Sequence, residues 1–212
     1  MYLVKSLVVV LMIIFLTSCT TFSQRDLKSF ENSSADIYFV PIGPFAPEYL
    51  VSLAAYYEET FNLSVGITPP LPYRKKLYSP KRKQLVTQEL LTLMRETFDG
   101  IYQNKRAIFI GVTHSDMYIQ GKNWRFAYSQ RIGWNYAVHS SARTTKNHNN
   151  NFLEIKKVHP GLRKMVTKTV GLLHFKKPTN SNPKSVLYNK VLGLNDLENI
   201  DESTVYKDIL DK

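Results

Sequence analysis

The chain has 212 residues and a formal net charge of +11, and it contains a single cysteine. One cysteine excludes an intrachain disulfide, so the fold must be stabilised by a hydrophobic core, which a chain of this length can form within a single domain. The positive charge favours contact with anionic surfaces such as phospholipid headgroups, lipopolysaccharide or acidic polymers, the alternative being a solvated surface that only aids solubility.

The first 18 residues have the three zones of a secretory signal peptide: Lys5, an apolar run at 7–16, and the small residues Thr17 and Ser18. The apolar run is too short to span a bilayer, which requires about 20 residues. The sequence Leu-Thr-Ser-Cys that ends at Cys19 is similar to the lipobox of bacterial lipoproteins. This resemblance implies acylation of Cys19 and cleavage just before it. The alternative is an ordinary signal peptide that contains a cysteine.

An acylated Cys19 would make the protein lipid-anchored in the cell envelope, with membrane lipid as a partner. Thr20 replaces the aspartate of an inner-membrane retention signal, so we expect the periplasmic face of the outer membrane if the organism is Gram-negative. The polar residues 19–35 predict a flexible tether to one domain at 36–212. We expect no nucleic-acid partner, because an exported, lipid-anchored protein rarely meets nucleic acid.

Hydrophobic periodicity predicts a β-α-β unit at the start of the domain. Short strands are expected at 37–40 and 63–67, with a helix between them at 47–61 whose apolar side chains share one face. Such a unit favours a parallel pair of strands.

The rest of the domain alternates in the same way. The expected elements are a basic loop at 73–83, a helix at 84–98, a strong strand at 106–112, strands at 124–128 and 136–139 with turns near Gly121 and Gly133, a helix that begins near Pro160, and a short terminal helix or turns at 192–210. Gly171 is expected to let the chain turn near the end of the third helix.

Several short segments follow one another in an order that resembles the archaemetzincins, a family of metzincin-like zinc metallopeptidases. They are Val40-Pro41-Ile42-Gly43, Leu71-Pro72, Arg82-Lys83-Gln84, Ile110-Gly111-Val112-Thr113 with Asp116, Trp124-Arg125-Phe126-Ala127 and Ala137-Val138-His139-Ser140-Ser141-Ala142-Arg143. The resemblance covers about residues 36–201. It implies an α/β fold, a zincin-like single domain with a mixed twisted sheet and packed helices.

The zinc motif of the family, H-E-x-x-H-x-x-G-x-x-H, is only partly kept. Gly171 and His174 match its glycine and last histidine, whereas Lys164 and Lys168 occupy the other two histidine positions and Met165 occupies the glutamate position. Protonated lysine has no lone pair for a metal, and methionine cannot act as the base that activates water.

Other parts of the metal chemistry also have no counterpart. Cys19 is the only cysteine, so the cysteine-rich second zinc site of the family is absent, and Leu187 stands where the family has the methionine of its methionine turn. No Asp or Glu occurs at 155–195 to replace the glutamate. The resemblance therefore implies a retained scaffold without a cofactor, and zinc enters only if its ligands lie elsewhere.

These observations favour a lipid-anchored cell-envelope protein with a catalytically degenerate zinc-metallopeptidase fold that serves as a binding or scaffold module. One alternative is an active zinc-dependent metallopeptidase with a non-standard site. Another is a basic envelope lipoprotein that binds an anionic envelope component through Arg163, Lys164 and Lys168. The two lysines are also explained as the polar face of an amphipathic helix.

The histidines are scattered along the sequence and provide little support for a metal site built from other residues. His114 and Asp116 follow the strong strand, where sites often lie, but such a pair is also typical of loop capping. Ser140 and Ser141 lack the glycines of a nucleophile elbow.

Overall fold

The computed structural model describes residues 33–43, 47–71, 74–100, 105–144 and 160–211. The predicted signal peptide, Cys19 and most of the predicted tether lie outside the described residues. Within the described ranges, no helix is long and apolar enough to cross a bilayer.

A five-stranded sheet in the order β2-β1-β5-β8-β7 forms the centre of the domain. Its strands are β1 (Ile37–Ile42), β2 (Val65–Ile67), β5 (Ile108–Thr113), β7 (Ser129–Ile132) and β8 (Tyr136–Ser140). Strands β2, β1, β5 and β8 are parallel to one another, and the edge strand β7 is antiparallel to β8. The predicted α/β fold with a mixed sheet is confirmed, and so is the parallel pairing of the β-α-β unit.

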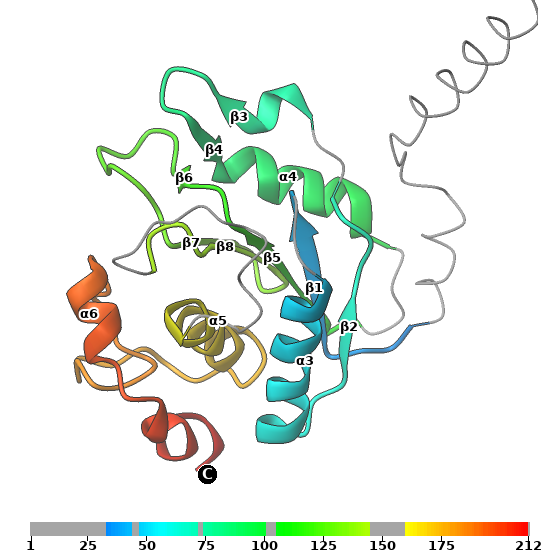
Figure 1. Cartoon of the computed structure of the whole chain (residues 1–212). Helices are drawn as coiled ribbons and strands as arrows, with labels where there is room; N and C mark the ends of the chain where they lie inside the picture. The colour runs from blue at the N-terminus through cyan, green and yellow to red at the C-terminus, as the bar shows by residue number, and fades with distance from the viewer. Residues whose placement is uncertain (1–32, 44–46, 72–73, 101–104, 145–159, 212) are drawn as a thin grey trace, which may run out of the picture.

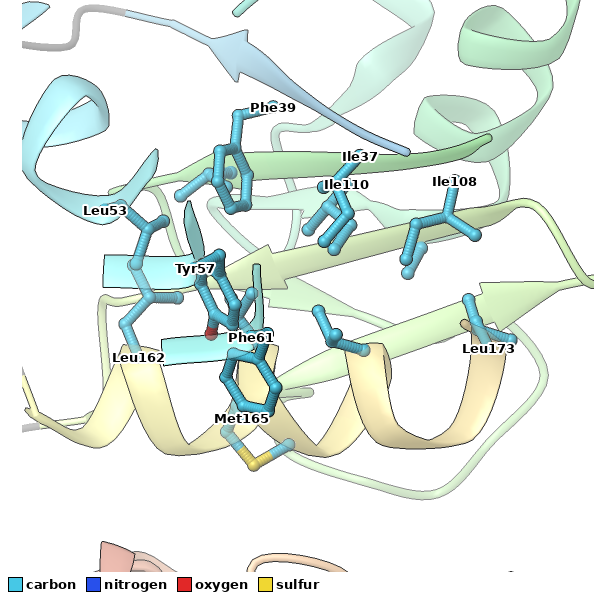
Figure 2. Close-up of a cluster of buried hydrophobic side chains, with 14 of the residues drawn as sticks. Ile37, Phe39, Leu53, Tyr57, Phe61, Ile108, Ile110, Leu162, Met165 and Leu173 are labelled. Atoms are coloured by element: carbon cyan, nitrogen blue, oxygen red, sulfur yellow. The ribbon is translucent and has the colours of Figure 1, made fainter. Parts of the chain in front are cut away.

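Helices cover both faces of this sheet (Figure 1). Helices α3 (Pro47–Phe61) and α5 (Pro160–Leu173) lie on one face, and α4 (Thr87–Phe98) lies on the other. Alternate residues of each strand point to opposite faces, so Ile37 and Phe39 pack towards α3 and α5, whereas Tyr38 and Val40 pack towards α4. Figure 2 shows the first of these two cores between the strands and α5.

A second, three-stranded sheet explains why the helix predicted at 84–98 begins later than expected. It consists of β3 (Tyr78–Ser79), β4 (Gln84–Val86) and β6 (Met117–Tyr118), and a short 3-10 helix at Lys75–Leu77 precedes it. The Gln84 side-chain amide donates hydrogen bonds to the Asp116 carboxylate (2.9 Å) and the Arg125 carbonyl (2.8 Å). These long-range contacts hold residues 84–86 extended, and α4 begins at Thr87.

The strand predicted at 124–128 is not formed. The Trp124 carbonyl accepts a hydrogen bond from the Arg82 guanidinium (2.7 Å), and the Arg125 carbonyl accepts from Gln84. Backbone groups that bond to side chains in this way are not available for a strand ladder. The neighbouring strand β7 begins only at Ser129.

The chain after α5 wraps against that helix as α6 (Leu194–Asn199), a 3-10 turn at Glu202–Thr204 and a helical turn at Tyr206–Leu210. Gly171 lies inside α5 rather than at a turn. A Cβ atom there would lie 2.9 Å from side-chain atoms of both Leu187 and Ile209. The glycine therefore permits close approach of the C-terminal segment to α5, a reason that local sequence does not reveal.

Candidate functional site

The helix α5 carries all the positions of the altered zinc motif except His174, which directly follows it. Leu162, Val166 and Val170 are buried in the core beneath the sheet. Met165, at the glutamate position of the motif, is only 6% exposed and belongs to the same core. Because Lys164 and Lys168 are four residues apart, they lie on one face of the helix.

Lys164 binds the end of α6. Its ammonium group donates hydrogen bonds to the carbonyl oxygens of Leu197 (3.1 Å) and Glu198 (3.2 Å). Carbonyls in the last turn of a helix have no intrahelical partner, and a cation also interacts favourably with the negative end of the helix dipole. Lys164 thus joins the C-terminal turn of α6 to α5.

Lys168 makes a similar contact one turn further along α5. Its ammonium group donates a hydrogen bond to the Tyr188 carbonyl, which follows Leu187 in the chain. Burial, with a contribution from the positive charge of Arg131, lowers the pKa of Lys168 to about 8. The lysine at the second histidine position is therefore a partly buried donor to the backbone of the C-terminal segment.

Arg163 is paired with an acid. Its Nε and Nη2 atoms each lie 2.7 Å from a carboxylate oxygen of Glu202, and its guanidinium lies 4.9 Å from the ring centroid of Tyr56. The hydrogen bonds to Glu202 raise the pKa of Arg163. The anion site predicted at Arg163, Lys164 and Lys168 stays a prediction, and in this structure each of the three groups has a protein partner.

His174 lies apart from these contacts. Its ring is half-buried and packs edge-on against Phe175, with 4.8 Å between ring centroids. Burial lowers its pKa, and the nearby Asp36 opposes that shift. The His174 ring therefore packs against Phe175, whereas Lys164 and Lys168 bind backbone carbonyls further along the chain.

Zinc, which the fold family implies, does not fit these residues. Two of the three ligand positions, Lys164 and Lys168, hold ammonium groups bonded to carbonyls. The position of the glutamate base, Met165, holds a thioether in the hydrophobic core. Across the described ranges, no three His, Cys, Asp or Glu side chains are placed to hold one metal ion.

A serine and histidine pair was not predicted from the sequence. His114, just after β5, has its Nδ1 atom 2.6 Å from Oγ of Ser141, just after β8. These strands are parallel neighbours, so their carboxyl ends meet, but only the sheet order reveals this. Asp116, which also follows β5, pairs with Arg143 at 2.6 Å. Burial lowers the pKa of His114 to about 4, which makes it a weak base and favours a structural link between the strands.

The most unusual polar group is His139 on β8. It is completely buried, and neither ring nitrogen has a hydrogen-bond partner within the described part of the chain. Burial, together with the charge of Arg131, lowers its pKa to about 3, so the ring is neutral at physiological pH. A buried polar group without a partner costs stability.

Comparison with known proteins identifies the fold. No protein-family profile and no curated protein sequence matches the chain. Among solved structures, the archaemetzincin from Archaeoglobus fulgidus in complex with malonate is 19% identical, with a TM-score of 0.57 over 77% of this chain and 91% of that one.

Two further structures agree with this result. The archaemetzincin from Methanopyrus kandleri is 19% identical, with a TM-score of 0.57 over 80% of this chain and 88% of that one. A zinc-dependent peptidase from Methanocorpusculum labreanum is 14% identical, with a TM-score of 0.55 over 77% and 93%. The chain therefore has the fold of the archaemetzincins.

Proposed function

We propose that this protein is a lipid-anchored protein of the cell envelope whose archaemetzincin-like domain serves as a binding or scaffold module without zinc peptidase activity. The similar structures are zinc metallopeptidases, which supports a peptidase-like fold as the starting point. The proposal departs from their chemistry because of the residues on α5.

One observation carries the proposal. At the two positions where the family's motif has histidines, Lys164 and Lys168 donate hydrogen bonds to backbone carbonyls of the segment after α5. An imidazole in those places would offer a lone pair to a metal, whereas an ammonium group offers only N–H donors. The helix that binds metal in a zincin thus holds two parts of the domain together.

Metal content tests this proposal. Full-length protein that has been loaded with zinc and freed of excess ion is expected to retain only substoichiometric zinc by elemental analysis, and a His174→Ala variant is expected to retain the same amount. Since His174 is the only remaining motif ligand, stoichiometric zinc that disappears in His174→Ala would establish the alternative, an active metallopeptidase with a non-standard site.

The anchor is tested separately through Cys19. A Cys19→Ala variant loses the thiol that would carry the acyl chains, so it is expected to move from the membrane fraction to the soluble fraction. Thr20→Ala serves as the control, because it alters the neighbouring residue and leaves the thiol in place. Equal membrane retention of Cys19→Ala and the unchanged protein would contradict acylation at this residue.

A further inference from the structure

Three parallel strands begin at the same edge of the main sheet. Ile37 of β1 pairs with Ile108 of β5, and Phe109 of β5 pairs with Tyr136 of β8. The chain that leads back to Cys19 meets the domain just before β1, where Ser33 accepts a hydrogen bond from the Tyr38 hydroxyl (2.7 Å) and Ala35 is buried. The anchor is therefore attached to the edge at which the strands begin.

The hairpin turn between β7 and β8 lies at this same edge and exposes two large apolar side chains. Ile132 is 38% exposed and Trp134 is 66% exposed, and Gly133 between them has a φ of 58°, which suits a tight turn. The other exposed large apolar residues of the described chain occur singly. Two such residues within one turn form a small apolar projection.

Cations occur on two chain segments next to this projection. Lys105 and Arg106, just before β5, are exposed, and the Asn135 side chain links them to the turn by donating a hydrogen bond to the Ala107 carbonyl (2.8 Å). The ammonium group of Lys176, which comes from the segment after α5, lies 4.7 Å from the Trp134 ring centroid. We call Lys105, Arg106, Ile132, Trp134 and Lys176 the tip surface.

The acidic side chains near the tip surface have partners. Asp36 accepts a hydrogen bond from the Ser64 backbone N–H (3.0 Å). Asp99 accepts one from the Tyr136 hydroxyl (2.6 Å) and lies 3.8 Å from Arg95. A hollow of about 320 Å³ beside Trp134, lined by Arg95, Asp99, Ile132 and Tyr136 among others, leaves room for a polar headgroup. Three of the five residues of the tip surface are cations, and Asp99 is the acid that lines the adjoining hollow.

We infer that the tip surface docks on the anionic headgroup region of the membrane that holds the anchor, so that the domain lies on the bilayer in one orientation. This inference rests on the proposed lipid anchor. Tryptophan is favoured at the membrane interface because its ring is apolar and its N–H is polar. Lysine and arginine beside it are attracted to anionic lipid, and the tether joins the domain on the same side.

The chain contains two tryptophans, and they provide a matched test. Trp124 is 54% exposed, but the neighbouring Arg125 carbonyl binds Gln84, which in turn binds Asp116 beyond the carboxyl end of β5. Trp124 thus lies towards the opposite end of the sheet from Trp134. A Trp124→Phe variant leaves Trp134 as the only indole, and Trp134→Phe leaves Trp124.

The Trp124→Phe and Trp134→Phe variants, each as the full-length lipoprotein, would be reconstituted in vesicles of phosphatidylglycerol and phosphatidylethanolamine with brominated acyl chains. Fluorescence of Trp134 is expected to be quenched by the bromine, and fluorescence of Trp124 is expected to be unaffected. Equal quenching of Trp134 and Trp124, or the absence of any quenching of Trp134, would overturn the inference. Protection of Trp134 from acrylamide in native envelopes, without quenching in lipid vesicles, would overturn it in favour of a protein partner.

Charge is tested with matched pairs in the Cys19→Ala background, where binding does not depend on acyl chains. Neutralising Lys105 and Arg106 with glutamine is expected to weaken binding to phosphatidylglycerol vesicles by about fivefold per charge. The control pair Lys122→Gln and Arg125→Gln, which removes the same charge near Trp124, is expected to change binding less than twofold. Equal losses would indicate attraction by net charge alone and would contradict a specific docking face.

Failure of the anchor and failure of the docking face give different results. If Cys19→Ala stays on native membranes as fully as the unchanged protein, the anchor proposal fails. The comparison of Trp134 with Trp124 in brominated vesicles still decides whether the tip surface contacts lipid.

Discussion

Acidification from about pH 6.5 to pH 3 is expected to lower the free energy of unfolding by roughly 4 kcal/mol through His139 alone. The unfolded chain binds a proton at this imidazole near pH 6.5, whereas burial lowers the folded pKa to about 3. Between these values the unfolded state binds more protons than the folded state. The stability contributed by neutral His139 is therefore fully present above pH 6.5 and is lost as the pH falls.

Denaturant unfolding of the unchanged protein and a His139→Leu variant, compared from about pH 7 to pH 4, measures this contribution. The variant is expected to lose less stability in acid and to be at least as stable at pH 7, because no buried ring nitrogen remains without a partner. His174→Gln is the control, since that ring is only half-buried and its removal should alter the pH dependence less. Strong destabilisation by His139→Leu at pH 7 would indicate a bound partner, such as an internal water.

The substitution Met165→Glu, which introduces the glutamate that the archaemetzincin zinc motif has at this position, is expected to destabilise the domain by about 2–4 kcal/mol. Met165 is 6% exposed and belongs to the hydrophobic core, so a carboxylate there loses its hydration. Lys168, three residues later, is the cation at the helical spacing that could face a carboxylate here, but its ammonium group already binds the Tyr188 carbonyl. The free energy of unfolding in urea, measured near pH 7, gives the cost directly.

Two companion variants separate charge from shape. Met165→Leu keeps an apolar side chain of similar volume and is expected to cost less than about 1.5 kcal/mol. Met165→Gln is polar without charge and should fall between the leucine and glutamate variants. If Met165→Glu were as stable as Met165→Leu, the new carboxylate would have reached solvent or taken Lys168 from Tyr188, and α5 would be more adaptable than its contacts indicate.

Local sequence predicted the layers of the fold well because periodic apolar residues determine them. The predicted helix at 47–61 coincides with α3, and β1, β5, β8 and α5 are found at the expected places. The failures have long-range causes. Local periodicity predicts a helix at Gln84 because its partners Asp116 and Arg125 are distant in sequence. It predicts a strand at 124–128, although the carbonyls of Trp124 and Arg125 bind side chains of Arg82 and Gln84.

The sequence predicts which residues form the candidate site, but it does not predict the groups that they contact. Spacing alone places Lys164 and Lys168 on one face of a helix, but their carbonyl partners lie 20 or more residues further along the chain. Local sequence predicts a turn at Gly171 because the side chains that require a glycine there, Leu187 and Ile209, are distant in sequence. Nothing in the sequence indicates that His139 is buried without a partner, since that depends on how α5 and the sheet pack together.

The contacts of Lys164 and Lys168 have a consequence for single substitutions towards a metal site. A zinc site needs at least three protein ligands, and of the motif's three histidines this chain keeps one. Replacing either lysine alone by histidine removes a donor from the carbonyls of Leu197 and Glu198 or from that of Tyr188, and it does not complete a ligand set. Each single replacement would therefore remove a contact between α5 and the segment that follows it, and it would not by itself create a zinc site.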